Sequence, residues 1–265
     1  MTNKRPLTRE IIIQALVDAL EPLGYIHAFW EGGAVAFDRV DDYSDIDLYL
    51  VVDDEKVDDT FLAVERTLRS LSPITQKHGV FEPSLPGLFQ AFYRLQDASE
   101  YLMIDVAVFK LSSPDKLLET EIHGHPVFYF NKSSKVKQSP LNKEAFAEKL
   151  QKRSKGLQGE FDMFHNLVQK EIYRGNPLEA IAFYHMLLAW LVEALRIQYN
   201  PLHHDFRMRY IHYELPSEVV SKLGRLCFIK DKDDLQKKYD EVVRWFPKTI
   251  SEIDKKKIER QIEVA

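Results

Sequence analysis

The chain contains a single cysteine, Cys227, among its 265 residues. One cysteine excludes an internal disulfide framework and any cysteine-rich zinc site. Because Leu226 and Phe228 on either side are apolar, we expect Cys227 to be a small buried side chain without a catalytic role. The sequence also lacks the apolar core of a secretory signal at its start and any run approaching the ~20 apolar residues that span a bilayer. We therefore predict a cytoplasmic protein that has no membrane partner.

An excess of positive charge is also missing. The formal net charge is −5 and the isoelectric point is about 6.0, so no global basic field attracts nucleic acid, and a polynucleotide partner is not expected. Basic clusters at residues 152–155 and 255–257 lie on predicted helices and are interpreted as solvated faces. With 45% hydrophobic residues the chain can fill two ordinary cores, and we favour two domains.

Helix and strand signals alternate in the first half of the chain. Thr8 suits the N-cap of an amphipathic helix that Gly24 would end. Strands are predicted at residues 25–30, 46–52, 74–78, 88–95 and 101–109. A helix is predicted to begin within residues 53–59 and to run to Ser70. The last two of these strands would form a hairpin. A short strand follows at residues 127–130, and we interpret His123 and His125 before it as turn residues rather than metal ligands.

Helical periodicity replaces the strand signals after a polar stretch at residues 131–142. One long helix is predicted from Lys143 to Arg174 and a second over residues 178–199. Two or three further helices follow, with breaks expected at Pro216 and Pro247. The sequence thus predicts an α+β domain over residues 1–138, with a mixed sheet flanked by helices, and an all-α helical-bundle domain over residues 139–265.

Acidic side chains occur on two of the predicted strands. Asp45 and Asp47 stand one residue apart at the start of the strand over residues 46–52, and the period of two places both on one face. Asp105 lies inside an apolar strand, where a lone carboxylate is costly unless it is paired or binds a cation. Carboxylates are hard ligands for Mg²⁺, which also retains the phosphates of a nucleotide. A cation shared by Asp45, Asp47 and Asp105 would explain these positions. The grouping therefore indicates metal-dependent nucleotidyl transfer.

Three motifs in this order resemble the nucleotidyltransferase superfamily that includes the aminoglycoside and lincosamide adenylyltransferases. They cover roughly the first 110 residues and read Trp30-Glu31-Gly32-Gly33-Ala34-Val35-Ala36-Phe37, Tyr43-Ser44-Asp45-Ile46-Asp47-Leu48 and Ile104-Asp105-Val106. The resemblance implies a nucleotidyltransferase domain followed by a helical domain that binds the acceptor. It implies that the three aspartates are catalytic and hold two Mg²⁺ ions. ATP or another nucleoside triphosphate would donate a nucleoside monophosphate, most simply AMP, to a hydroxyl of a small molecule such as an aminoglycoside- or lincosamide-like antibiotic.

The nucleotide is expected to contact Gly32, Gly33, Ala34 and Ser44. Members of the family commonly carry serine and glycine where this chain has Ala34 and Asp38. Backbone N–H groups near Gly33 and the N-terminus of a following helix would then hold the triphosphate, because helix starts attract anions.

A polar and aromatic segment at residues 203–210 carries Arg207 and Arg209. Guanidinium groups bind phosphate through paired hydrogen bonds, so these two residues are expected to contact the triphosphate. The alternative is a surface helix whose arginines pair with acids. Tyr184 or His185 could also take part, although their apolar stripe most simply describes bundle core.

Other interpretations stay open. An Asp-x-Asp at a strand start is often a solvated turn, and a glycine pair often marks a tight turn. With Ala34 and Asp38 in the glycine motif, the chain could be a lapsed nucleotidyltransferase that serves as a nucleotide-binding or protein-interaction module. A third possibility is nucleotidyl transfer to tRNA or to a protein side chain, and the acidic isoelectric point disfavours tRNA.

Overall fold

The computed structural model of the chain describes residues 7–80, 85–133 and 135–264. The chain divides into two compact units, Met1–Pro140 and Leu141–Ala265. The division lies close to the domain boundary that the sequence predicts after residue 138. Each unit has its own core and is described by itself.

The first unit is built on a six-stranded mixed sheet with the order β3-β4-β5-β2-β1-β6. The strands are β1 (Ile26–Glu31), β2 (Ile46–Val52), β3 (Ile74–Val80), β4 (Leu88–Leu95), β5 (Ile104–Lys110) and β6 (Val127–Asn131). Strands β2 and β5 run parallel, whereas the other neighbouring pairs are antiparallel. The predicted hairpin of β4 and β5 is confirmed.

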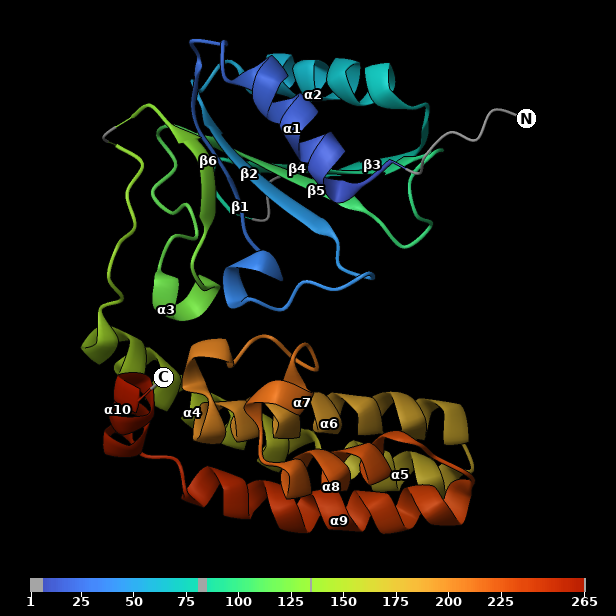
Figure 1. Cartoon of the computed structure of the whole chain (residues 1–265). Coiled ribbons are helices and arrows are strands. Elements are labelled where there is room, and N and C mark those ends of the chain that lie inside the picture. Colours follow the sequence, from blue (N-terminus) through green and yellow to red (C-terminus); the bar gives the residue numbers. More distant parts are fainter. Residues whose placement is uncertain (1–6, 81–84, 134, 265) are drawn as a thin grey trace. The chain divides into compact units, whose positions relative to one another are not determined.

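Two helices, α1 (Arg9–Leu20) and α2 (Val57–Leu71), lie side by side over one face of this sheet (Figure 1). Alternate residues of β2 point toward them, and Ile46, Leu48 and Leu50 are fully buried in the shared core. Thr8 occupies the N-cap of α1 as predicted, but the helix ends at Leu20 instead of continuing to Gly24. The two faces of β2 therefore differ, and its polar residues belong to the face away from α1 and α2.

A second, aromatic core covers part of that other face. The Trp30 ring stacks on the rings of Tyr49 and Phe109, with centroid separations of 5.5 and 6.3 Å. Leu118 and Val136, from the segments that follow β5 and β6, complete this cluster. The apolar side chains of this face thus leave its polar positions near the starts of β2 and β5.

The second unit consists of helices. They are α4 (Lys143–Phe164), α5 (Asn166–Arg174), α6 (Pro177–Tyr199), η2 (Pro201–His203), α7 (Ile211–Glu214), α8 (Ser217–Cys227), α9 (Lys232–Ser251) and α10 (Lys255–Val264). Helix α6 packs against α4, α5 and α9. The single helix predicted from Lys143 to Arg174 is interrupted at His165, whose Nδ1 lies 3.0 Å from the Tyr239 hydroxyl.

Pro247 was expected to end a helix but lies inside α9. A proline removes one helical hydrogen bond. Buried residues on both sides of it, Phe246, Thr249 and Ile250, hold the helical path through packing. Tertiary packing therefore outweighs the local preference here.

Helix α6 corrects the expectation that no segment could span a membrane. It has 23 residues with a window of mean hydropathy 1.5, which is long and apolar enough by length and composition. The core helix of a bundle passes the same test, and α6 buries residues on several sides. The cytoplasmic location stays a prediction.

Cys227 is half-buried at the end of α8, and burial raises the pKa of its thiol. Of its two apolar neighbours in the sequence, Leu226 is buried, whereas Phe228 is 79% exposed. The expected apolar surroundings are therefore present only in part.

Candidate active site

Asp47 and Asp105 lie side by side on adjacent strands. They are register partners in the parallel ladder of β2 and β5. Partners in register point to the same face of a sheet, with neighbouring strands about 4.8 Å apart. Both side chains are half-buried on the face away from α1 and α2. The structure thus brings together two of the three carboxylates that the sequence singled out.

The electrostatics of Asp105 reflect this crowding. The pKa of its carboxyl is raised to about 7, mainly by burial, and the nearby charges of Asp47 and Asp45 act in the same direction. The amide of Gln90 on β4 opposes the shift, because its Nε2 donates to both carboxylate oxygens of Asp105 at 2.8 Å. Like charges held together in a partly buried place favour a bound proton or a bound cation.

Asp45 stands just before β2 and is held at two points. Its carbonyl oxygen accepts hydrogen bonds from Nη1 and Nη2 of Arg9, both at 2.8 Å. Its Oδ1 accepts from the Met103 N–H at 3.3 Å. The carboxylate of Asp45 is therefore directed toward the segment that leads into β5.

Among the residues that the structure describes, no group of three or more histidine, cysteine, aspartate or glutamate side chains is arranged to hold a metal ion. The donor chemistry of Asp47 and Asp105 nevertheless fits Mg²⁺, which commonly uses one or two carboxylates together with substrate phosphates. A cation would also relieve the repulsion that raises the Asp105 pKa. The three-aspartate site with two Mg²⁺ ions stays a prediction.

The glycine pair makes room for Asp47. Gly33 has a φ of +59°, and a Cβ on it would lie 1.7 Å from Asp47 Oδ2. A Cβ on Gly32 would lie 2.8 Å from the Tyr49 ring, and the Gly32 N–H donates to the Asp47 carbonyl at 2.9 Å. Both glycines thus let the end of β1 approach β2 closely at the carboxylate. The predicted phosphate contacts of Gly32 and Gly33 stay predictions.

The prediction of a helix after the glycine pair is wrong. The structure has a single 3₁₀ turn, η1 (Val35–Phe37), which ends at Asp38 with a left-handed φ of 54°. The Ala34 carbonyl accepts from the N–H groups of Phe37 and Arg39 and closes the turn. A turn this short offers no extended helix dipole for a triphosphate. Ala34 therefore stays a predicted contact through its backbone alone.

Ser44 lies in a closed loop before β2. Its Oγ donates to Asp41 Oδ1 at 2.8 Å and accepts from the Asp41 N–H at 2.9 Å. These bonds shape the loop that leads to Asp45, and a role of Ser44 in nucleotide binding stays a prediction.

Arg207 and Arg209 belong to the second unit and are exposed. The guanidinium of Arg209 lies 4.1 Å from the centroid of the Phe206 ring. The carbonyl oxygens of both arginines accept hydrogen bonds from Arg196, with 2.6 Å to that of Arg207. Their segment is thus fixed through its backbone, and the predicted phosphate contacts remain untested.

Tyr184 is part of the helical core. It is fully buried, its hydroxyl donates to the Leu226 carbonyl at 2.9 Å, and burial raises its pKa. His185 is exposed. The structure therefore favours the core interpretation of the stripe that carries Tyr184.

Sequence reasoning missed three residues that support the carboxylates: Arg9, Glu31 and Gln90. Arg9 carried one usable signal, because a cation in the first turn of a helix is unfavourable to the helix dipole unless it has another partner. Its Nη2 lies 2.7 Å from Glu31 Oε1. Gln90 gave no signal, since its contact to Asp105 depends on the pairing of β4 with β5.

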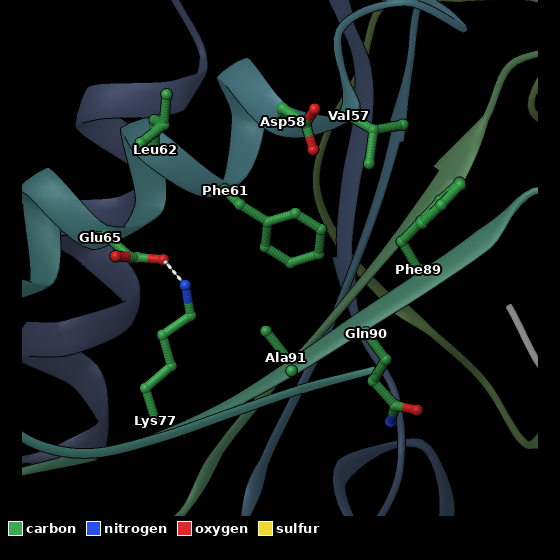
Figure 2. Close-up of a pocket in the computed structure, with 10 residues that line it drawn as sticks. Val57, Asp58, Phe61, Leu62, Glu65, Lys77, Phe89, Gln90 and Ala91 are labelled. Atoms are coloured by element: carbon green, nitrogen blue, oxygen red, sulfur yellow. Dashed lines mark hydrogen bonds and ion pairs between the residues drawn. The ribbon is translucent and has the colours of Figure 1, made fainter. Parts of the chain in front are cut away.

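A cavity of about 280 Å³ lies elsewhere in the first unit, between α2, β3 and β4. Phe61, Leu62 and Phe89 supply much of its apolar lining. The Gln90 side chain points away from Phe61 (Figure 2). It reaches Asp105 on the opposite face of the sheet. The cavity and the carboxylates are therefore on different faces.

Comparisons with known proteins give a resemblance to solved structures. No protein-family model matches the sequence, and no curated protein matches it. The chain is similar to the crystal structure of an aminoglycoside 6-adenyltransferase from Bacillus subtilis, with 13% sequence identity and a TM-score of 0.34, over 97% of this chain and 92% of that chain.

Proposed function

We propose that the chain is a Mg²⁺-dependent nucleotidyltransferase that moves a nucleoside monophosphate, most simply AMP from ATP, onto a hydroxyl of a small molecule. The observation that carries the proposal is the pairing of Asp47 with Asp105 on adjacent parallel strands. Two like charges in a half-buried place oppose folding, so the arrangement is best explained by a cation and phosphates that it binds.

The residues of the chain have separate roles in this proposal. Asp47 and Asp105, with Asp45 beside them, would hold the cation, which neutralises charge that develops on the transferred phosphoryl group. Gln90 orients the Asp105 carboxylate through hydrogen bonds of 2.8 Å. Asp105 is also the candidate acceptor for the proton of the substrate hydroxyl, because a carboxylate placed at the reacting group can act as a general base.

The acceptor is proposed from the motifs. Their order resembles that of aminoglycoside and lincosamide adenylyltransferases, so hydroxyl-rich antibiotics of these two classes are the first acceptors to test. The helical unit, with Arg207 and Arg209, is the proposed place of acceptor and triphosphate contacts.

Pyrophosphate release tests this function. With ATP, MgCl₂ and a panel of aminoglycosides and lincosamides, we expect turnover by the wild type. Asp47→Asn and Asp105→Asn should each lower the rate by about 10²-fold or more, because each removes a charge that stabilises the transition state. The control is Asp18→Asn on the exposed face of α1, which changes the same functional group. Full activity in either active-site variant, with its fold checked by circular dichroism, would refute the assignment.

A lapsed nucleotidyltransferase is the second candidate. It is favoured by the single turn of η1 after Ala34 and by the absence of a three-ligand metal group among the described residues. Calorimetry separates the two. Binding of ATP with Mg²⁺, without pyrophosphate release on small acceptors or on protein side chains, would support a nucleotide-binding module.

A further inference from the structure

Arg9, the first residue of α1, contacts the main chain of the candidate active site. Its two terminal nitrogens donate to the Asp45 carbonyl, both at 2.8 Å. The same guanidinium forms an ion pair with Glu31, with 2.7 Å between Nη2 and Oε1. Glu31 in turn accepts a hydrogen bond from the Tyr129 hydroxyl. The four residues come from four separate segments of the first unit.

This contact is shielded from water. The side chain of Arg9 is 16% exposed and that of Glu31 is 3% exposed. Burial, and then the hydrogen bond to Glu31, raise the pKa of Tyr129, so its hydroxyl remains a donor. A buried ion pair is weak support for stability, because desolvation offsets the attraction. Its effect here is geometric, since a guanidinium fork fixes the position of the oxygen that it binds.

The ion pair of Arg9 and Glu31 lies where it can fix the main chain before β2. Glu31 ends β1 directly before the glycine pair, and Asp45 directly precedes β2. The Asp45 side chain accepts from the Met103 N–H, and the Met103 carbonyl accepts from the Ile46 N–H at 2.9 Å. Arg9 therefore holds the main chain of Asp45, while the segment before β5 holds its carboxylate.

We propose that Arg9, oriented by Glu31, is a positioning residue for Asp45. By holding the Asp45 main chain, it fixes where the Asp45 carboxylate lies relative to Asp47 and Asp105, and thereby raises the affinity of the site for a divalent cation. The role of the cation rests on the proposed function, whereas the hold on Asp45 does not depend on it.

The first unit contains a matched control. Lys77 Nζ lies 2.5 Å from Glu65 Oε1, and the Tyr93 hydroxyl donates to the same oxygen at 3.4 Å. This is again a cation, a glutamate and a tyrosine, but it joins α2, β3 and β4. Glu65 and Lys77 line the cavity (Figure 2). Lys77→Met therefore removes a more exposed ion pair of the same kind, with Lys77 41% exposed, without touching Asp45.

The test compares Arg9→Met, Arg9→Lys and Lys77→Met by amide hydrogen exchange and by Mn²⁺ titration followed by electron paramagnetic resonance. Arg9→Met should speed exchange at the Met103 and Ile46 amides about tenfold and weaken Mn²⁺ binding about tenfold, as loss of a supporting contact to a metal site does. Arg9→Lys should restore part of both, because an ammonium can still donate to the carbonyl. Lys77→Met should leave both within about twofold of wild type.

The outcomes separate this inference from the proposed function. If wild type binds Mn²⁺, Asp47→Asn does not, and Arg9→Met changes neither exchange nor affinity, the positioning role is overturned while the function stands. Faster exchange with unchanged affinity also overturns it. If wild type fails to bind Mn²⁺ but Arg9→Met still frees the two amides, the hold on Asp45 stands and the metal-dependent function fails.

A second variant, which keeps Arg9, tests the proposal if Arg9→Met does not fold. Glu31→Gln removes the charge that orients Arg9 but retains its shape. It should show the same two changes at smaller size, and wild-type values in a folded Glu31→Gln protein would argue against the proposal.

Discussion

The carboxyl of Asp105 links the stability of the protein to pH. In the folded chain its pKa is raised to about 7, first by burial and then by the charges of Asp47 and Asp45. In an unfolded chain the pKa of an aspartate is about 3.9. The folded state therefore binds this proton more tightly, and the stability it contributes is fully present below about pH 4 and is lost as the pH rises toward 7.

Replacing Asp105 by asparagine should remove this dependence. In EDTA, the wild-type melting temperature is expected to fall between pH 5 and pH 7, with up to about 1.4 kcal/mol lost per pH unit from this group. Asp105→Asn should flatten that part of the profile and melt higher than wild type at pH 8, although we expect it to be inactive. Thermal unfolding across this range is the measurement. Asp18→Asn serves as the control, and parallel profiles for wild type and Asp105→Asn would contradict the prediction.

The candidate aspartates could be found from sequence because Asp47 and Asp105 interrupt apolar strands and Asp45 stands two residues before Asp47. Arg9 and Gln90 could not be found in this way. Arg9 lies 36 positions from Asp45 and Gln90 lies 15 positions from Asp105, and their side chains acquire a role only when the sheet and α1 assemble. Contacts of this kind depend on register, which a single sequence does not specify.

Among the elements, strands with clear alternation were predicted well. The bounds of β2 and β4 agree with the sequence prediction. Buried and less buried residues alternate along much of both strands, and β2 ends in a run of buried residues. The helix after Gly33 was expected from the family resemblance rather than from its own residues, and the left-handed Asp38 ends it after one turn. The break at His165 and the continuity through Pro247 both follow from packing that no local pattern reports.

The second unit contains a buried ion pair that fastens its irregular segment. Arg196 on α6 is fully buried, its Nη1 lies 2.7 Å from Glu214 Oε2, and it also binds the carbonyl oxygens of Arg207 and Arg209. It thereby connects α6 to the turns that lead into α7. The sequence showed a single arginine within an apolar helix, but not what it contacts.

Arg196→Met is expected to destabilise the second unit by about 3–5 kcal/mol, because Glu214 is left charged and buried without this partner. The comparison is Arg153→Met, since Arg153 pairs with Glu193 at 2.6 Å but is 35% exposed. That variant should cost no more than about 1 kcal/mol. Urea unfolding of both variants gives the free energies, and similar losses would show that burial does not set the difference.

At the scale of the whole molecule, the sequence predicts a domain boundary in the polar stretch at residues 131–142. The division between Pro140 and Leu141 falls within it. Composition was a poor guide to α6, since a helix that packs against a bundle can resemble a membrane span in hydropathy. Hydropathy reports that a segment is apolar, but the surrounding helices determine what covers it.

Each unit should fold when it is expressed alone. Residues 1–140 and 141–265 have separate cores, so we expect one cooperative thermal transition for each. Mn²⁺ binding should remain with residues 1–140, because the three aspartates, Arg9 and Gln90 all lie there. Nucleotidyl transfer should require the whole chain, since the acceptor is proposed to bind the helical unit. Transfer catalysed by residues 1–140 alone, or Mn²⁺ bound by residues 141–265 alone, would contradict this division of roles.

The parallel ladder of β2 and β5 has a consequence for how the site comes into being. Strands β1 and β2 pair antiparallel, and so do β3, β4 and β5. The ladder of β2 and β5 is the seam between these two groups of strands. Pairing across such a seam is non-local and closes late in folding. Asp47 and Asp105 face each other across it. A newly made chain therefore meets the repulsion between its own carboxylates at the step that joins β2 to β5, and a divalent cation present at that moment would ease this pairing.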